Sequence, residues 1–282
     1  MNENSNKKWG SRVTGWLRVT GEDAATYLQS QFSNDLSGAQ VSTATYGLFL
    51  SLKGKVRADA FICQTATDVF NVVSYQCTSS DLRALLEENV IADEVEFFVQ
   101  EVGSSFVLAT DAMPQVSAGG LAFPGRRMRA PHFDVLLPAG HAMEPDHSEE
   151  LERLRILAGI PSVPLDLGPG DLPQEAGVEP AAVSFNKGCY LGQEVMARLK
   201  AMGRVQRRLF GVSGGGAPPD SQTQVRCADQ IAGEVRSIVQ NDAGGWVGIA
   251  MLRRKFLETT QSGSWTLESG GMMEVGEVLD DG

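Results

Sequence analysis

One eight-residue segment of the chain reads Lys187-Gly188-Cys189-Tyr190-Leu191-Gly192-Gln193-Glu194. Its two glycines bracket three larger residues, and glycine permits tight turns and a close approach of the backbone to a ligand. A helix is expected over residues 194–202, where a carboxylate in the first turn suits the helix dipole. The amide of Gln193 offers both a donor and an acceptor, so it could bind the edge of a heterocycle. The segment therefore predicts a turn that leads into a helix and can line a binding site.

The residues around this turn are strongly basic. Residues 187–208 hold six lysines and arginines and one acid, a local charge of 6 − 1 = +5, whereas the whole chain carries 24 − 35 = −11. A concentrated positive patch on an acidic protein favours a focused anion site. A solvated basic face that offsets nearby acids would explain the same pattern, so charge alone leaves both interpretations open. The six basic residues are Lys187, Arg198, Lys200, Arg204, Arg207 and Arg208.

Cys189 also has two interpretations. It could be a reactive thiolate, favoured by Lys187 nearby and by the N-terminus of the helix that follows. It could equally be a small, half-buried residue, which is common for cysteine. The chain has four cysteines without a CxxC pair, so we expect neither a disulfide framework nor a metal site, and we expect a reducing cytoplasm.

The two ends of the chain differ in their patterns. Short strands separated by turn residues are expected after the Gly-Pro-rich stretch 214–219, which favours a small β-barrel or sandwich. Before residue 205 the order is strand, helix, strands, helix, strands, which favours an α+β fold with antiparallel sheets. We therefore expect two domains, 1–205 and 206–282. The expected C-terminal strands are 224–227, 231–239, 246–252, 265–267 and 272–278.

Composition excludes several classes of protein. With 42% apolar and 21% charged residues the chain is typical of a globular protein. It contains no run of about 18 apolar residues, and its first residues are polar, so we expect no spanning helix and no signal peptide. A charge of −11 argues against general binding to nucleic acids. Tyr190 is the only aromatic residue in 187–208, whereas a base-stacking surface would need several.

The segment KGCYLGQE resembles the signature of the YgfZ family, the folate-binding relatives of the glycine-cleavage T-protein, whose mitochondrial counterparts are iron–sulfur assembly factors. The resemblance extends over residues 12–280. It implies a folate-binding module of two ferredoxin-like halves followed by a C-terminal β-barrel. Further matching segments are 19–24, 27–31, 34–35, 53–56, 155–161, Arg198, 203–205 and 207–209.

The resemblance also implies a function, a cofactor and a set of residues. A central cavity would hold tetrahydrofolate or a derivative, and the protein would support assembly or repair of iron–sulfur enzymes, including tRNA-modifying ones. Asn34 and Asp35 are candidates to bind the pterin, and the stretch from Arg198 to Arg208 to bind the glutamate tail. Cys189 would lie near the cavity mouth. The remaining candidates for cofactor binding are Arg155, Lys187, Gly188, Tyr190, Gly192, Gln193 and Glu194.

One departure from the family bears on catalysis. T-proteins carry two adjacent acids on the strand after the glycine turn, whereas this chain has Ala58 and Asp59. Asp59 could activate an amine of a folate adduct, because that chemistry needs a positioned carboxylate. On an alternating strand it could also face solvent. An aminomethyl or one-carbon transferase is therefore the alternative function, and a module that binds RNA through the basic stretch is a third hypothesis.

Overall fold

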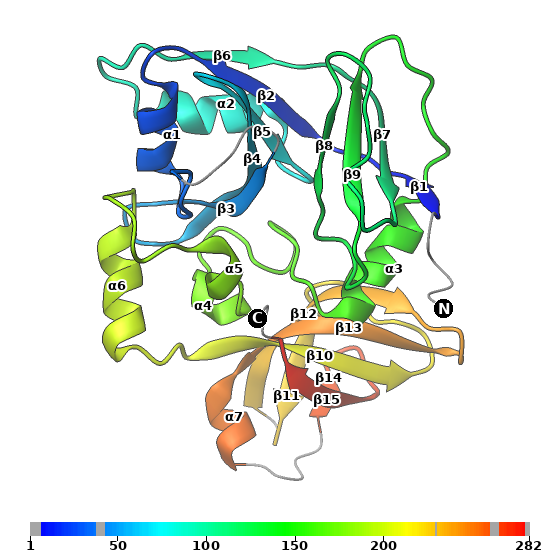
Figure 1. Ribbon diagram of the computed structural model, residues 1–282. Helices are drawn as coiled ribbons and strands as arrows, with labels where there is room; N and C mark the ends of the chain where they lie inside the picture. The colour runs from blue at the N-terminus through cyan, green and yellow to red at the C-terminus, as the bar shows by residue number, and fades with distance from the viewer. Residues whose placement is uncertain (1–6, 38–42, 229, 260–264, 280–282) are drawn as a thin grey trace.

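The computed structural model describes residues 7–37, 43–228, 230–259 and 265–279. Figure 1 shows two sheets side by side and a barrel below them. Residues between the second sheet and the barrel run through the space between these parts. All strand pairs inside the three sheets are antiparallel. The expected α+β class with antiparallel sheets and a C-terminal barrel is confirmed.

The first sheet has five strands, and both of its helices lie on one face. Ala58, Ala60 and Ile62 of strand β4(Val56–Ala66) belong to the core cluster that contains Leu28 and Leu82 of these helices. Because side chains alternate along a strand, the residues between them point to the other face, toward the middle of the molecule. The strand order is β3(Ala44–Leu50), β4(Val56–Ala66), β5(Val69–Ser74), β2(Gly15–Thr20) and β6(Glu96–Val99), with α1(Ala24–Gln31) and α2(Ser79–Glu87).

The second sheet has four strands, and one helix, α3(Ser148–Ala158), packs beside it. This helix ends at Gly159 in the left-handed conformation, as the Ala-Gly-Ile-Pro sequence predicts. The strand β7(Val102–Leu108) of this sheet follows β6 of the first sheet directly, with only residues 100–101 between them, so consecutive strands belong to different sheets. The strand order is β1(Lys8–Gly10), β7(Val102–Leu108), β9(Phe133–Pro138) and β8(Leu121–Pro124).

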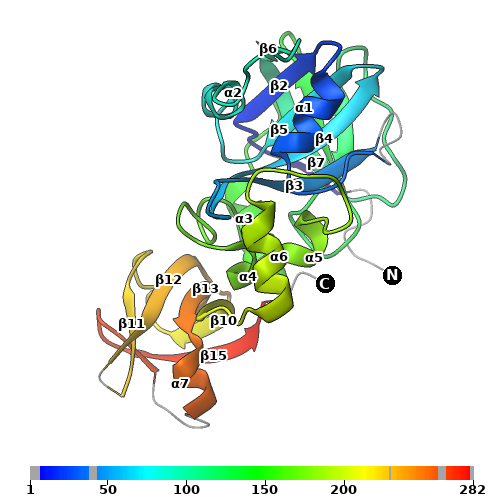
Figure 2. The ribbon, with the colours of Figure 1, turned by 90° about the vertical axis from the view of Figure 1, so that its left-hand side faces the viewer.

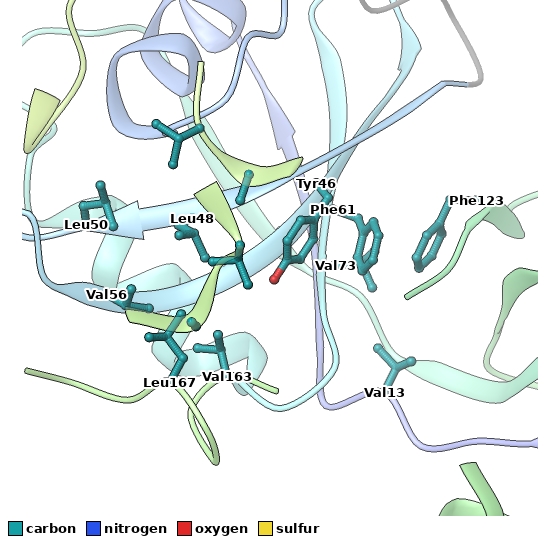
Figure 3. Packing of buried hydrophobic residues seen from close by; sticks show 14 of the residues in the cluster. Val13, Tyr46, Leu48, Leu50, Val56, Phe61, Val73, Phe123, Val163 and Leu167 are labelled. Carbon is teal, nitrogen blue, oxygen red and sulfur yellow. The ribbon is translucent and has the colours of Figure 1, made fainter. Parts of the chain in front are cut away.

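An apolar cluster joins the two sheets in the middle of the molecule. The ring centroids of Tyr46 and Phe61 are 5.2 Å apart, and those of Phe61 and Phe123 are 4.7 Å apart, so the three rings form a row from one sheet to the other (Figure 3). Val163 and Leu167, from the irregular segment after α3, belong to the same cluster, and Figure 3 shows them beside Val56 of β4. The helices in the rest of this segment are α4(Pro173–Ala176), α5(Glu179–Ala182) and α6(Gln193–Met202).

The C-terminal strands form a closed barrel, which decides between the two architectures that the sequence left open. The five predicted strands are all present. A further strand, β10, was not predicted, because its glycines lower strand propensity. Gly214 is required there, since a Cβ would stand 2.5 Å from the ring of Trp246. The order is β10(Arg207–Gly215), β13(Gly245–Arg253), β12(Gln230–Gln240), β11(Gln224–Cys227), β14(Trp265–Leu267) and β15(Met272–Val278), with α7(Arg254–Thr259) after β13.

Candidate functional site

Asp59 lies on the face of β4 that points to the middle of the molecule, and it is 6% exposed. The hydroxyl of Tyr46 donates a hydrogen bond to its Oδ2 at 3.1 Å, and Ser74 Oγ donates to its Oδ1 at 3.4 Å. Burial raises the pKa of Asp59 to about 6, against the lowering effects of Tyr46 and Arg126. The solvent-facing alternative for Asp59 is therefore wrong, because the interior face of this sheet is covered.

The neighbouring position 58 faces the other way. Ala58 is buried among the residues that pack under α1 and α2. A second acid at this position would point into that apolar cluster and away from Asp59. The carboxylate that this chain retains is therefore the one that faces the interior.

The connection between β8 and β9 brings two arginines to two tyrosines of the first sheet. The guanidinium of Arg126 stacks 4.1 Å from the ring centroid of Tyr46, and that of Arg127 stacks 3.8 Å from the ring of Tyr75. Buried Asp134 accepts from Arg127 Nε at 2.8 Å and from the Tyr75 hydroxyl at 2.6 Å. This network fixes the two arginines at the junction of the two sheets.

A cavity of about 280 Å³ opens beside this network. Four arginines and one glutamate are among the residues that line it, so its charged groups are mainly positive. Arg127 Nη2 is buried and has no hydrogen-bond partner within the described part of the chain. A buried donor without a partner is costly, so this atom favours an acceptor in the cavity. The cavity is lined in part by Arg12, Tyr75, Arg126, Arg127, Glu152 and Arg155.

Arg155, a predicted cofactor-binding residue, reaches the cavity wall, but its donors bind protein groups. Its Nη1 donates to Asp166 Oδ2 at 2.6 Å, and its Nη2 donates to Ser237 Oγ at 2.9 Å. Its Nε donates to Glu152 Oε2 at 2.9 Å. Since Ser237 belongs to β12, Arg155 connects α3 to the barrel. Arg155 therefore forms a joint between α3 and the barrel.

Lys187 holds the end of α1. Its Nζ donates to the backbone carbonyls of Gln29 at 2.7 Å, Phe32 at 2.8 Å and Asn34 at 2.7 Å. An ammonium group has three protons, so these bonds use all of its donors. Partial burial lowers the pKa of Lys187 to about 8, which leaves the group charged at neutral pH. The ammonium would have to release a carbonyl before it could bind a ligand.

Asn34 and Asp35 also bind protein groups. The Asn34 Nδ2 donates to the carbonyls of Tyr46 at 2.8 Å and Ala181 at 2.9 Å. Asp35 Oδ1 accepts from Gln29 Nε2 at 2.8 Å and from the backbone and hydroxyl of Ser37. Hydrogen bonds from Ser37 and Gln29 lower the pKa of Asp35 to about 2. Their predicted role in binding the pterin stays a prediction.

In the rest of the segment 187–194, some residues pack against other parts of the protein and others are exposed. Tyr190 is buried, and its hydroxyl has no partner among the described residues. Gly192 is left-handed, with φ +87°, and lies against the β3–β4 turn, whereas a Cβ on Gly188 would meet open space. Cys189 is exposed, so its half-buried interpretation is wrong. Gln193 begins α6, and Glu194 and Arg198 form an exposed ion pair at 3.0 Å.

The predicted residues therefore fall in two places. Asn34, Asp35 and the segment 187–194 gather around the end of α1, whereas Asp59 and Arg155 lie near the central cavity. Tyr46 connects the two, since its carbonyl accepts from Asn34 and its hydroxyl donates to Asp59. The sequence did not identify the tyrosines or the pair Arg126-Arg127. That adjacent pair of arginines outside the basic stretch was the available signal.

Over residues 7–37, 43–228, 230–259 and 265–279, no helix has the length and apolarity that crossing a membrane requires. Within the same ranges, no group of three or more His, Cys, Asp or Glu side chains is arranged to hold a metal ion.

Known proteins resemble this chain in sequence and in fold. Residues 12–109 match the model of the GCVT N-terminal domain. The structure resembles the glycine cleavage system aminomethyltransferase T from Bartonella henselae with a TM-score of 0.80. The two chains are 15% identical, and the match covers 97% of this chain and 86% of that one. At this identity the likeness establishes the fold alone.

Curated relatives match most of the chain. The human iron–sulfur cluster assembly factor IBA57, mitochondrial, is 30% identical, over 84% of this chain and 74% of its own. Its mouse counterpart is 28% identical, over 86% and 76%. The tRNA-modifying protein YgfZ of Vibrio vulnificus (strain CMCP6) is 26% identical, over 88% and 84%. This chain therefore belongs to the family of YgfZ and IBA57, whose fold is that of the glycine-cleavage aminomethyltransferase T.

Proposed function

We propose that this protein binds tetrahydrofolate or a derivative in its central cavity and supports the assembly or repair of iron–sulfur enzymes, tRNA-modifying enzymes among them. The names of the relatives support the second part, since they are an iron–sulfur cluster assembly factor and a tRNA-modifying protein. The link to tRNA would then be indirect, through a client enzyme. We place this function in the cytoplasm and assign it to a module over 1–205 followed by a barrel domain over 206–282.

The observation that carries the folate proposal is the cavity lined by four arginines, one of which, Arg127, has a buried Nη2 without a hydrogen-bond partner among the described residues. A folate has carboxylates at one end, an aromatic ring in the middle and a hydrogen-bonding pterin at the other. Carboxylates pair well with arginine, so Arg126 and Arg127 would hold the glutamate end. Tyr75 would contact the aromatic ring, and Asp59 would accept hydrogen bonds from the pterin if Tyr46 and Arg126 moved aside.

The volume of the cavity limits how much of a folate could enter it. Ligand pockets typically measure about 300–1,000 Å³, and a volume of about 280 Å³ is just below that range. The cavity would therefore hold one part of an extended folate, with the remainder in the open approach to it.

Calorimetric titration with tetrahydrofolate tests the proposal. We expect wild-type protein to bind, and Arg127→Gln to weaken binding about tenfold or more through loss of a charge-assisted hydrogen bond. Arg83→Gln is the matched control, because Arg83 is an exposed residue paired with Glu87 on α2. Unfolding curves of both variants separate a binding defect from a folding defect. Absence of binding by the wild type at millimolar tetrahydrofolate would refute the proposal.

Asp59 favours a second candidate function, an aminomethyl or one-carbon transferase. A carboxyl group whose pKa is raised to about 6 can accept a proton from an amine near neutral pH. In that case Asp59 is indispensable in the cell. A deletion strain complemented with Asp59→Ala tests this, with iron–sulfur enzyme activities as the readout. Full activity of Asp59→Ala together with loss of activity in Cys189→Ala would exclude the transferase.

A further inference from the structure

The helix α6 has an outer face that no other helix or strand of the described residues covers. Met196 is the one buried side chain among residues 193–201 of this helix. Figure 2 looks onto this side of the molecule, and α6 lies toward the viewer without another helix or strand across it. Its exposed side chains include the small residues Ala197 and Ala201, which would allow a partner to approach closely.

This face is also the basic part of an acidic chain. Arg198 is exposed on α6, and Arg204 is exposed in the turn after it. Glu194 is the one acid of the stretch 187–208, and its ion pair with Arg198 is exposed on both sides, with side-chain exposures of 87% and 68%. Exposed ion pairs contribute little free energy, so this pair could exchange for contacts with a partner.

The β3–β4 turn extends the basic face past the beginning of α6. A Cβ on Gly54 would stand 3.0 Å from Val195 and 2.7 Å from Met196, so the turn and the helix are in direct contact. Lys53, which is exposed, and the partly exposed Lys55 flank this contact. The basic groups therefore continue from Arg204 to Lys53 along one side of the protein.

A groove of about 420 Å³ adjoins this turn, and it is the apolar part of the same surface. Leu52 and Leu191 line it, together with Lys53 and the ion-paired Arg57 and Glu88. Leu52 is 79% exposed, at the tip of a turn where a polar residue would be expected. An exposed aliphatic side chain beside a groove is a typical anchor point for another chain.

We propose that α6 and the β3–β4 turn bind an acidic segment of a partner protein. Its carboxylates would pair with Lys53, Arg198 and Arg204, and an aliphatic side chain would pack on Leu52 in the groove. This α6 surface fits a protein better than RNA, because Glu88 and Glu194 border it and 187–208 contains no exposed aromatic residue for stacking on bases. The inference goes beyond folate binding and does not depend on it.

The test uses a fluorescein-labelled peptide of alternating glutamate and aspartate around one leucine, followed by fluorescence anisotropy with the full chain. We expect the double variant Arg198→Glu with Arg204→Glu to weaken binding about tenfold or more, because charge reversal at an interface slows association and weakens the complex. The matched control is Arg18→Glu with Arg83→Glu, which reverses two exposed charges on β2 and α2 and should leave affinity within about twofold. Binding should also weaken as salt rises.

The groove is tested separately. Leu52→Asn should weaken binding of this peptide several-fold, and a peptide with serine in place of leucine should bind wild type and Leu52→Asn alike. Three results would overturn the proposal. The wild type could fail to bind the peptide at low salt. It could bind single-stranded polyadenylate more tightly than the peptide and lose that binding in the double variant, or it could form dimers that disappear in the double variant. Calorimetry with tetrahydrofolate on the double variant keeps this test distinct from that of the folate site.

Discussion

Gly192 and Gly54 lie against each other where α6 begins. A Cβ built on Gly192 would stand 3.3 Å from the Cα of Gly54 and 2.7 Å from the carbonyl oxygen of Ser51. The segment 187–194 and the Lys-Gly-Lys turn, which are 132 or more residues apart, therefore pack backbone against backbone. Gly192 and Gly54 serve this contact, and no ligand is needed to explain these two glycines.

Gly192→Ala should destabilise the protein by more than about 2 kcal/mol, because the left-handed φ costs about 1–2 kcal/mol for alanine and the contact with Ser51 adds to it. Gly188→Ala is the control, since a Cβ there meets nothing within 4 Å. Urea unfolding of the two variants measures the difference. Equal stability would show that the turn can move away from α6.

Lys187→Met should lower the free energy of unfolding by about 2–4 kcal/mol, because three backbone carbonyls at the end of α1 lose a charged donor. Lys53→Met, at an exposed position, should change it by less than about 0.5 kcal/mol. Chemical denaturation gives both values. A folded, stable Lys187→Met protein that had lost tetrahydrofolate binding would instead indicate direct contact with the ligand.

Asp59→Asn should make the protein more stable above pH 6. The pKa of Asp59 is about 6 in the folded protein against 3.8 when unperturbed, so its contribution to stability is full below about pH 4 and is lost as the pH rises through 6. The difference in the free energy of unfolding between Asp59→Asn and wild type should therefore grow from pH 4 to pH 8, and it should reach on the order of 2–3 kcal/mol.

Urea unfolding at several pH values checks this prediction. Asp35→Asn should show the opposite pH dependence. Hydrogen bonds lower the pKa of Asp35 from 3.8 to about 2, so its carboxylate stabilises the fold above about pH 4 and loses this effect as the pH falls through 2. Replacement of Asp35 should therefore cost stability at neutral pH. If the difference in the free energy of unfolding between wild type and Asp59→Asn stayed constant from pH 4 to pH 8, Asp59 would not titrate between these pH values.

Arg155→Met should destabilise the joint between α3 and the barrel by about 3–5 kcal/mol, since it leaves the buried carboxylate of Asp166 without its cation. Arg153→Met is the neighbouring control. Arg153 pairs with Asp242 at the surface of the same joint, and that pair should be worth about 1 kcal/mol or less. Thermal unfolding compares the two, and similar melting temperatures would contradict the prediction.

Local sequence patterns were sufficient for the parts of the fold that depend on neighbouring residues. The barrel strands 224–227, 265–267 and 272–278 occur with the predicted bounds, because turn residues delimit them on both sides. That β6 and β7 belong to different sheets was not predicted, because it depends on their pairing with β2 and β9, which no local pattern in residues 95–110 records.

The sequence by itself determined the family, through the segment 187–194, and with it the α+β fold and the barrel. The tertiary structure alone decided what individual side chains do. Lys187 binds carbonyls more than 150 residues away, and Arg127 meets Tyr75 across two sheets. Asp59 and Ala58 are adjacent in the chain yet point to opposite faces of β4. Hydrogen bonds and burial depend on groups brought together from distant segments, and no local pattern records which groups those are.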